Sequence, residues 1–128
     1  ICFIMEMNMI EKFGIGIDII DVNRFKKIPY VSKMNLYKKI FLSSEIKYCL
    51  KYKNQYEHFA GKFAIKEAVK KSIKEQISLL EIETSHSNSK PRVKLKTKKK
   101  INYIFLASIS HEKNYAIGIV ISEKIELC

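Results

Sequence analysis

The spacing at which apolar residues recur changes along the chain, from a helical to a strand-like repeat. This change limits the possible folds more than any other feature. Residues 55–75 carry apolar side chains at helical spacing, which predicts one long helix. Strand-like stretches, which alternate or run apolar, are 13–20, 79–85, 92–97, 103–110 and 115–122. Short polar connections at 87–91 and 111–114 predict antiparallel hairpins. The chain is therefore predicted to be α+β, with an antiparallel sheet packed against one long and several short helices.

The short helices are expected before the long one, over residues 22–28, 33–41 and 44–52. Asp21 is predicted to cap the first of them, and Ser43 or Ser44 the last, because short polar side chains accept hydrogen bonds from the free N–H groups of a helix start. At 128 residues the chain is long enough for one buried core and too short for two. We therefore expect a single domain over residues 1–128.

Basic residues dominate the charge: 24 Lys and Arg stand against 13 Asp and Glu, a net charge of +11. Such a field attracts anionic partners, which include nucleic acid, a phosphorylated cofactor and an acidic protein. A basic RNA-binding module is one interpretation, because Tyr48, Tyr52 and Tyr56 recur every four residues, although such a row is more typical of packing between helices. The charges are scattered apart from the triplet Lys98–Lys100, so no dedicated nucleic-acid arm is expected.

The cysteines, Cys2, Cys49 and Cys128, are odd in number and lack CxxC spacing, so neither a disulfide framework nor a zinc site is expected. This usage predicts a reducing, cytoplasmic location. Residues 1–10 are apolar, but they contain an acidic residue, lack a basic start and are too short to span a membrane, so they resemble neither a signal nor an anchor. Because the sequence begins at Ile1 and not at Met, an organellar location stays open.

Two carboxylates fall where a folded chain normally places apolar side chains. Asp18 shares a strand face with two glycines, whose small size leaves room for another group to approach. Glu67 falls within the apolar arc of the long helix and is expected to point inward. Buried carboxylates need a compensating cation, so the pair suggests a site for Mg²⁺, which prefers oxygen ligands. The alternative is that Asp18 caps local backbone and Glu67 pairs with Lys70 or Lys71, and the pattern alone does not decide.

His111 and the lysines of the long helix are further candidates for a site. His111 follows a predicted strand, where an imidazole can act as acid, base or phosphate contact, although a lone histidine in a turn is more often solvated. The lysines of this helix are Lys62, Lys66, Lys70, Lys71 and Lys74. They would neutralise phosphate charge if Glu67 held a metal, whereas the simpler interpretation is a solvated basic face. His58 and His86 have no evident partners and are expected at the surface.

Three segments occur in order between residues 13 and 122: GIGIDIIDVNRF, FAGKFAIKEAVKK and SISHEKNYAIGIVI. Together they resemble the holo-acyl-carrier-protein synthases, the small bacterial type of 4′-phosphopantetheinyl transferase. The resemblance implies that family's fold and a Mg²⁺-dependent transfer of phosphopantetheine from coenzyme A to a serine of apo acyl carrier protein, with release of adenosine 3′,5′-bisphosphate. It also implies a place in fatty acid biosynthesis and a homotrimer that binds the coenzyme between subunits, without a nucleic-acid or membrane partner.

The resemblance assigns roles by position. Asp18 and Glu67 would be the metal ligands, and they would act in catalysis together with His111. Arg24 would dock the acidic carrier protein, which the net charge of +11 would help to attract. The coenzyme-binding residues would be Lys62, Lys66, Lys71, Pro91, Ser110 and His111.

Two departures from the family pattern bear on the coenzyme site. Lys62 stands where the family commonly has Arg, which removes a bidentate phosphate contact. The glycine-rich turn expected after the long helix is replaced by SIKEQIS, at residues 72–78. A degenerate member that binds coenzyme A without transferring its arm is therefore an alternative to the enzyme.

Overall fold

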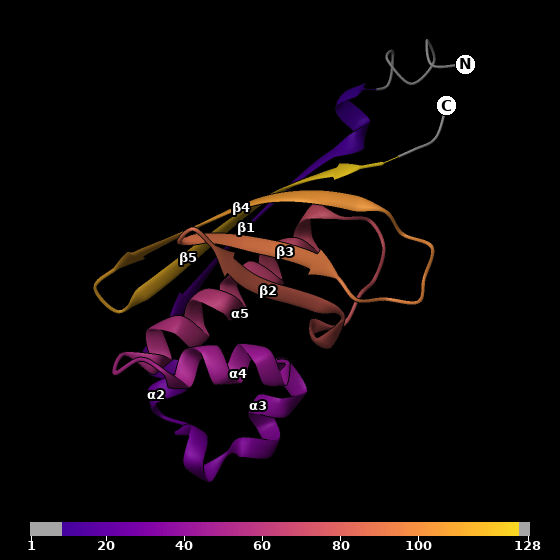
Figure 1. Cartoon of the computed structure of the whole chain (residues 1–128). Helices are drawn as coiled ribbons and strands as arrows, with labels where there is room; N and C mark the ends of the chain where they lie inside the picture. The colour runs from indigo at the N-terminus through magenta and orange to yellow at the C-terminus, as the bar shows by residue number, and fades with distance from the viewer. Residues whose placement is uncertain (1–8, 126–128) are drawn as a thin grey trace.

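A three-stranded antiparallel sheet and a two-stranded hairpin form the framework of the computed structural model, which describes residues 9–125 (Figure 1). The sheet consists of β1 (Phe13–Asp21), β4 (Tyr103–Glu112) and β5 (Tyr115–Lys124), in the order β1–β5–β4. The hairpin pairs β2 (Ile82–Ser87) with β3 (Lys90–Leu95). The predicted α+β class with antiparallel strands is confirmed.

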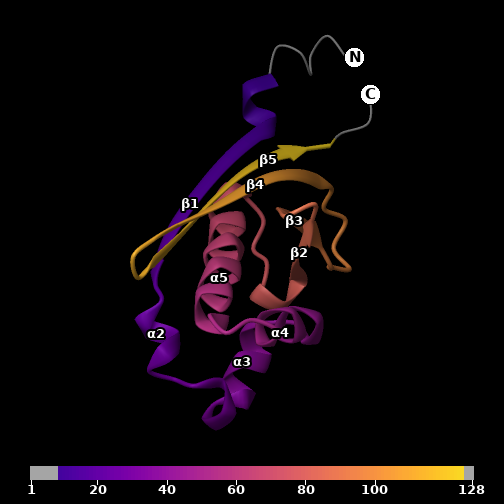
Figure 2. The same cartoon turned by 60° about the vertical axis from the view of Figure 1, so that its left-hand side comes forward.

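The helices α2 to α5 lie on one side of the three-stranded sheet (Figures 1 and 2). Their bounds are α2 (Asn23–Lys26), α3 (Met34–Ile40), α4 (Ser43–Leu50) and α5 (Gln55–Ser72), and 3-10 turns occur at η1 (Met9–Lys12), η2 (Tyr30–Ser32) and η3 (Leu79–Glu81). The long helix α5 packs against β1 and β5, and the three shorter helices gather at one end of it (Figure 2). None of the helices in residues 9–125 is long and apolar enough to cross a membrane.

All four α-helices are shorter than predicted, and the difference is largest for α5 and α2. α5 ends at Ser72, three residues early, because Ile73 adopts extended backbone and buries its side chain. α2 spans four residues, and its N-cap is Val22 and not Asp21. The Asp21 carboxylate instead accepts the backbone N–H of Asn23 at 2.9 Å, so it closes the turn that leaves β1.

The start of α4 also differs from the prediction. Ser43 and Ser44 lie inside the helix, and the cap position is Leu42, which has extended backbone. The Leu42 N–H donates to Glu45 Oε1 at 2.7 Å. The start of α4 is therefore stabilised by a carboxylate of its first turn and not by a serine hydroxyl at the cap position. Glu45 is itself buried, with 1% of its surface exposed.

The strand register decides which side chains share a face. On the central strand β5, Gly118 pairs with Asp18 of β1, and Ala116 pairs with His111 of β4. These residues lie on the sheet face that α5 covers. In the β2–β3 hairpin the turn predicted at 87–91 is confirmed, and its central residues, Asn88 and Ser89, have the positive φ values of 52° and 65° that a tight hairpin needs.

Glycines let α5 lie directly on the backbone of the sheet. A Cβ atom on Gly16 would come within 1.9 Å of the Ala68 carbonyl oxygen, and one on Gly118 within 2.9 Å of the Ala64 carbonyl carbon. The room that the sequence predicted beside Asp18 is therefore occupied by helix backbone. Asp18 consequently lies at the contact between β1 and α5.

Two clusters of buried side chains form the core. One is aromatic, and in it the Phe59 ring lies 4.8 Å from that of Tyr37 and 5.0 Å from that of Phe41. The other fills the space between the second half of α5 and the strands, and consists of Ile65, Ala68, Val69, Ile73, Ile77, Ile82 and Val120. Together they fix α5 against both β-elements and the short helices.

The sheet face opposite α5 is apolar and exposed. Its side chains include Ile15, Ile17, Ile19, Ile104, Leu106, Ile119 and Ile121. Leu106 is 69% exposed and Ile15 is 65% exposed, although both belong to central parts of their strands. A contiguous apolar face of this kind commonly marks a contact surface.

Candidate active site

Asp18 forms an ion pair with α5. The Lys71 Nζ lies 3.0 Å from Asp18 Oδ1 and also donates to the Ile17 carbonyl oxygen at 3.0 Å. Among the described residues, Asp18 is thus bonded to a helix side chain, and not to local backbone as the alternative interpretation required. The side chains of Asp18 and Lys71 are 18% and 54% exposed, so both can be reached from solvent.

Glu67 lies one turn before Lys71 on α5 and is half-buried. The prediction that it points inward holds only in part, because Ala64 and Ala68 take the central positions against the strands and leave Glu67 at the margin of the buried face. The ion pairs found in the described part of the chain do not include Glu67, so the alternative pairing with Lys70 or Lys71 is not formed.

The two carboxylates suit a hard divalent cation. Asp18 and Glu67 stand on a strand and a helix in direct contact, and the lysine one turn after Glu67 bonds Asp18. Within residues 9–125 no group of three or more His, Cys, Asp or Glu side chains is placed to hold a metal ion. Magnesium in proteins is usually held by one or two carboxylates, with waters and substrate phosphates as the remaining ligands. The donor set therefore fits Mg²⁺ bound together with a phosphorylated substrate.

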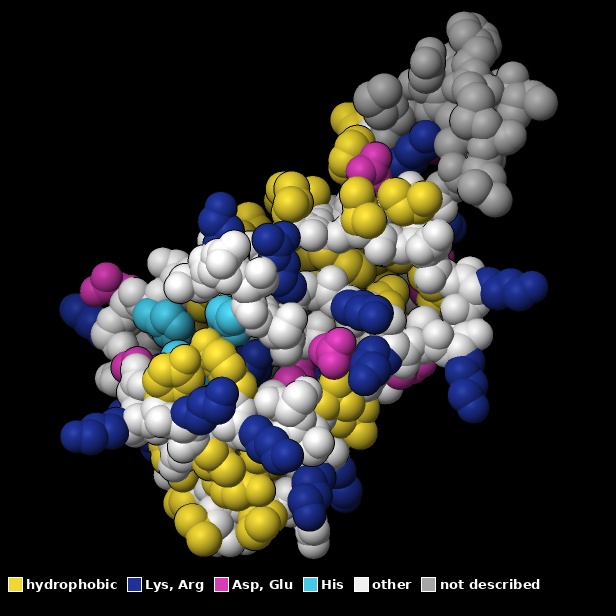
Figure 3. Space-filling view, in the orientation of Figure 1, with side chains coloured by type: hydrophobic (Ala, Val, Ile, Leu, Met, Phe, Trp, Pro, Cys, Tyr) yellow, Lys and Arg dark blue, Asp and Glu magenta, His cyan; other side chains and the backbone are white. Residues whose placement is uncertain are grey.

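A second group of polar side chains surrounds a cavity of about 190 Å³ beside the first half of α5. Its lining residues, from α5, the β2–β3 hairpin and β4, are His58, Gly61, Lys62, His86, Ser89, Pro91, Ile109 and His111. The chain has three histidines, and all of them line this cavity; Figure 3 shows them gathered on one side of the molecule. We call it the histidine cavity. It unites Lys62, Pro91 and His111 of the predicted coenzyme-binding residues.

Lys62 is buried at the base of this cavity, with 2% of its surface exposed. Its Nζ donates to Thr84 Oγ1 at 3.1 Å and lies 4.5 Å from the centre of the Tyr48 ring. Burial lowers the pKa of Lys62, whereas the nearby Cys49 and Glu45 raise it. The ammonium is therefore held in a fixed position, from which it contributes positive charge to the cavity.

Lys66 is not placed to contact a phosphate, which corrects the prediction from the resemblance. Its Nζ lies 2.7 Å from Glu45 Oε1, with both side chains 0% exposed, and donates to the carbonyl oxygens of Ile40 and Leu79 at 3.0 and 2.9 Å. All three donors of the ammonium are thus used inside the protein. Lys66 joins α5 to the short helices and to the start of the hairpin.

His58 and His86 are not isolated surface residues, contrary to the prediction. The Tyr48 ring stacks on His86 with centroids 4.7 Å apart, and the Tyr52 ring stacks on His58 at 4.0 Å. The Tyr56 hydroxyl oxygen accepts a backbone N–H at 3.1 Å. Each tyrosine of the row thus contacts another part of the protein, although Tyr52 stays 39% exposed. These contacts favour the interpretation of the row as packing over that of a stacking surface for RNA bases.

The sequence could have predicted the position of His86, but not that of His58. A hairpin with its turn centred at 88–89 places His86 opposite Pro91, and the structure has this pairing. His58 gave no such signal, because its contact with the hairpin depends on how α5 meets β2, which is a tertiary contact.

The Asp18–Lys71 pair and the histidine cavity lie on different sides of α5. Successive helix residues are about 100° apart, so His58 and Glu67, nine positions later, point about 180° apart. The strands agree with this, because Asp18 is on β1 and His111 is on β4, the two outer strands of the sheet. A single chain therefore does not bring Glu67 and His111 to the same side of the helix.

Ser110 and Arg24 lie apart from both groups. Neighbours on a strand point to opposite faces, so Ser110 faces the outer side of the sheet whereas His111 faces α5. Ser110 therefore does not line the histidine cavity of its own chain. Arg24 is on α2, and its guanidinium carbon lies 5.8 Å from the centre of the Phe63 ring.

Comparison with known proteins gives one consistent family. Residues 14–120 match the family model of the 4′-phosphopantetheinyl transferase superfamily. A holo-[acyl-carrier-protein] synthase of Thermodesulfovibrio yellowstonii is 41% identical over 116 residues, which cover 88% of this chain and 98% of the relative.

Solved structures agree with the sequence match. The holo-[acyl-carrier-protein] synthase of Helicobacter pylori in complex with coenzyme A superposes with a TM-score of 0.72 at 35% identity, over 85% of this chain and 99% of that chain. A holo-(acyl-carrier-protein) synthase from Bacillus anthracis in complex with CoA (3′,5′-ADP) gives 0.71 at 33% identity, over 88% and 96%. With this fold, these segments and this pair of carboxylates, the chain belongs to the 4′-phosphopantetheinyl transferase superfamily, as an enzyme of the holo-acyl-carrier-protein synthase type.

Proposed function

We propose that this chain transfers the 4′-phosphopantetheine arm of coenzyme A to a serine of an apo acyl carrier protein and releases adenosine 3′,5′-bisphosphate. The observation that carries the proposal is the placement of Asp18, Glu67 and Lys71 at one helix–strand contact of this family's fold. In the reaction, the serine oxygen forms a bond to the phosphorus that bears the pantetheine arm, and the bond from that phosphorus to the bridging oxygen of the diphosphate breaks. The serine hydroxyl gives its proton to solvent, and the electron pair of the broken bond leaves with the bisphosphate.

Asp18 and Glu67 hold Mg²⁺ in this proposal. When bound, the ion neutralises charge on the diphosphate and stabilises the departing phosphate. Lys71 is half-exposed and has one donor left beyond the two given to Asp18 and Ile17, so it can bind a phosphate oxygen beside the carboxylates. These side chains orient the diphosphate for attack by the serine.

The active form is a homotrimer, with the coenzyme bound between protomers. One support is that Glu67 and His111 point to different sides of α5, so a ligand that contacts both requires two copies of the chain. The other is the exposed apolar face of the sheet, which offers a surface for contact between copies.

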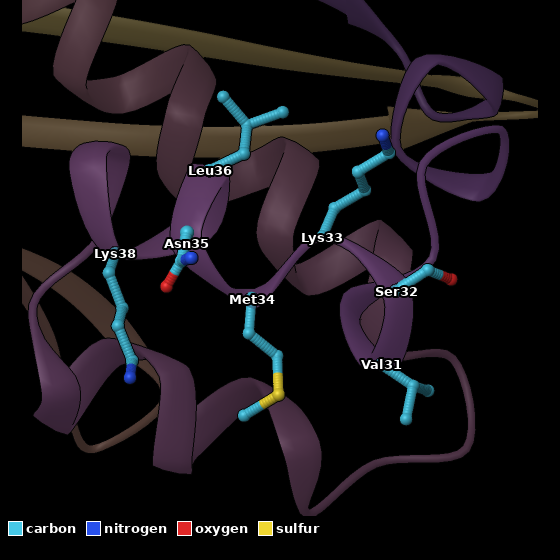
Figure 4. Close-up of a pocket in the computed structure, with 7 residues that line it drawn as sticks. All are labelled: Val31, Ser32, Lys33, Met34, Asn35, Leu36 and Lys38. Atoms are coloured by element: carbon cyan, nitrogen blue, oxygen red, sulfur yellow. The ribbon is translucent and has the colours of Figure 1, made fainter.

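The acidic carrier protein docks at the end of the molecule formed by α2, η2 and α3. Arg24 lies on α2, and residues of η2 and α3 line an open pocket of about 470 Å³ (Figure 4). This pocket combines the exposed apolar side chains of Val31 and Met34 with the ammonium groups of Lys33 and Lys38. Cationic side chains around apolar contacts suit an acidic protein, and the net charge of +11 speeds the encounter.

We place this activity in the cytoplasm and in fatty acid biosynthesis. Cys49 is buried and free, which is typical of a reducing compartment. Cys2, Cys128 and most of the apolar stretch 1–10 lie outside the described residues. The role in fatty acid biosynthesis is tested by comparing two carrier proteins as substrates. A fatty-acid carrier should be modified faster than a polyketide carrier.

Mass spectrometry of an apo carrier protein incubated with this chain, coenzyme A and Mg²⁺ tests the proposal. The wild type should add the mass of one phosphopantetheine arm to the carrier. Glu67→Ala and Asp18→Asn should each slow this gain by about two orders of magnitude or more, because they remove metal ligands. The variants should keep the folded circular dichroism spectrum, since both side chains lie at the margin of the core. Glu11→Ala, which removes an exposed carboxylate of η1, is the matched control and should retain activity.

Full activity of Glu67→Ala would overturn the assigned role. Binding of coenzyme A without any mass gain would instead support the degenerate family member, which Lys62 and the replaced glycine turn had suggested. Binding of RNA that weakens steeply with salt, with no response to coenzyme A, would support the RNA-binding module.

A further inference from the structure

A groove between α3 and α4 has no part in the reaction proposed above. Its volume is about 280 Å³, and its lining residues, from η2, α3, α4 and the residue before α4's second turn, are Tyr30, Lys38, Ser43, Ile46, Lys47 and Leu50. We call it the α3–α4 groove. It shares Lys38 with the open pocket at which the carrier protein is placed, so the groove and that pocket adjoin each other.

The walls of the groove are apolar and are held in place by the core. Ile46 is 6% exposed, and the Tyr30 ring packs against the aromatic cluster, with its centroid 5.3 Å from that of Tyr37. The Tyr30 backbone N–H donates to the Tyr56 hydroxyl oxygen at 3.1 Å, which fixes η2 against α5. Leu50, the last residue of α4, completes the wall and is 41% exposed. The groove therefore offers a preformed surface for an apolar chain, as ligand sites commonly do.

Two ammonium groups stand at this groove without a partner carboxylate. Lys38 and Lys47 are exposed, and the ion pairs found within residues 9–125 include neither of them. The described residues that line the groove include no Asp or Glu, and Glu45 of the same helix is buried against Lys66 instead. Ser43 adds an exposed hydroxyl, which can donate a hydrogen bond. The polar part of the lining thus matches a small anionic group.

An apolar wall beside two positive charges fits one class of ligand. A free phosphate would leave the apolar wall in water, and an alkyl cation would be repelled by the ammonium groups. An alkyl carboxylate satisfies both parts, because its chain covers Ile46 and Leu50 while its carboxylate pairs with the lysines. The volume lies at the lower end of the range for ligand sites, which favours a chain of medium length.

Building on the proposed function, we propose that the α3–α4 groove binds a medium-chain fatty acid and that the bound acid competes with the carrier protein for the adjoining surface. Lys38 carries the competition, since an ammonium paired with a carboxylate no longer attracts the acidic carrier. The added negative charge also opposes the carrier's approach. Fatty acids are the products of the process in which we place the enzyme, so their binding slows the activation of further carriers.

Isothermal titration calorimetry of the full chain with octanoate and decanoate, below their micelle concentrations, tests binding without reference to transfer. The dissociation constant should fall by about twofold to fourfold for each added methylene, because each methylene removes further apolar surface from water. 1-Octanol, which lacks the charge, should bind at least about tenfold more weakly than octanoate. Octyltrimethylammonium, which has the opposite charge, should not bind.

Two variants locate the site. Leu50→Glu places a negative charge in the apolar wall, Lys47→Gln removes one ammonium, and neither residue lines the pocket assigned to the carrier protein. Leu50→Glu should weaken decanoate binding by about tenfold or more, and Lys47→Gln by about threefold to tenfold. Lys53→Gln, an exposed lysine in the turn after α4 and outside the lining, is the matched control and should bind decanoate as the wild type does.

The transfer assay tests the competition. Decanoate should raise the KM for the apo carrier protein and leave kcat and the KM for coenzyme A unchanged, because Asp18 and Glu67 lie at a different contact, between β1 and α5. In Lys47→Gln the same concentration of decanoate should raise the KM for the carrier less. Inhibition that raises the KM for coenzyme A instead would overturn the competition.

Binding that does not depend on chain length, equal affinity for octanol and octanoate, or unchanged binding in both folded variants would each overturn the fatty-acid site. If Leu50→Glu does not fold, the ligand series and Lys47→Gln decide. Transfer activity without any binding of decanoate would remove this inference and leave the proposed function intact. Binding of decanoate at the groove by a chain that modifies no carrier would remove the proposed function and the competition, and leave the fatty-acid site.

Discussion

Replacing Glu45 by Ala should destabilise the protein far more than the loss of a surface charge. Glu45 Oε1 lies 2.7 Å from Lys66 Nζ in a pair whose side chains are 0% exposed, and Oε2 accepts the N–H and the hydroxyl of Thr84 at 2.8 and 2.6 Å. The variant leaves the Lys66 ammonium in the interior with two carbonyl partners and no counter-charge. It also removes the bond that caps α4 at Leu42.

The expected loss follows from these contacts. Removing one partner of a buried pair costs about 3–5 kcal/mol, and the lost cap costs about 1 kcal/mol more. The sum, about 4–6 kcal/mol, is a large part of the 5–15 kcal/mol by which domains of about this size are stable. At about 4 °C per kcal/mol the melting temperature should fall by about 15–25 °C.

Urea and thermal unfolding followed by circular dichroism, at one fixed protein concentration, measure this loss. Lys96→Met is the matched control, because its pair with Glu83 is long, at 3.6 Å, and Lys96 is 52% exposed, so it should change the free energy of unfolding by less than about 1 kcal/mol. Glu45→Met combined with Lys66→Met should recover part of the Glu45→Ala loss, since no charge is left unpaired. A Glu45→Ala loss below about 1.5 kcal/mol, or a double variant no more stable than the single one, would refute this account of the pair.

Two further predictions concern assembly. Leu106→Glu places a charge on the exposed apolar face of the sheet, where Leu106 is 69% exposed, and should convert the proposed trimer to smaller species with unchanged secondary structure, as measured by light scattering and circular dichroism. Persistence of the trimer would exclude this face as the contact. Mixing Glu67→Ala with His111→Ala protomers after dissociation should restore about a quarter of wild-type transfer activity. In a random mixture, about a quarter of the interfaces combine an intact Glu67 from one protomer with an intact His111 from its neighbour. Mixtures as inactive as their components would show that one protomer supplies both groups.

The elements that the sequence predicted well are those whose signal is local. The alternation of residues 13–20 predicts β1 because side chains of a strand point to opposite faces, and the turn at 87–91 sets the pairing of β2 with β3. The end of α5 was predicted less well. Ser72 is its last residue because Ile73 leaves the helix to join the core, and that preference is set by neighbours distant in the sequence.

The lysines of α5 show why the site could be predicted only in part. Lys62, Lys66 and Lys71 looked alike in the sequence, as members of one basic row on a helix. In the structure, Lys62 lies buried under the histidine cavity, Lys66 is bound to Glu45, and Lys71 is half-exposed beside Asp18. Their environments come from the hairpin, α4 and β1 respectively, and none of these contacts leaves a periodic signal in the sequence.

Thr84 links the stability of the fold to the histidine cavity. Its hydroxyl donates to Glu45 Oε2 at 2.6 Å, and the same oxygen accepts from Lys62 Nζ at 3.1 Å. The buried pair of Glu45 and Lys66 therefore holds Thr84 in place, and Thr84 in turn holds Lys62, which lines the histidine cavity. Under the coenzyme-binding role that the resemblance implies for Lys62, loss of Glu45 should weaken coenzyme binding as well as the fold, because Lys62 would lose its fixed position. One buried carboxylate, Glu45, is in this way bonded both to the core through Lys66 and to the lining of the histidine cavity through Thr84 and Lys62.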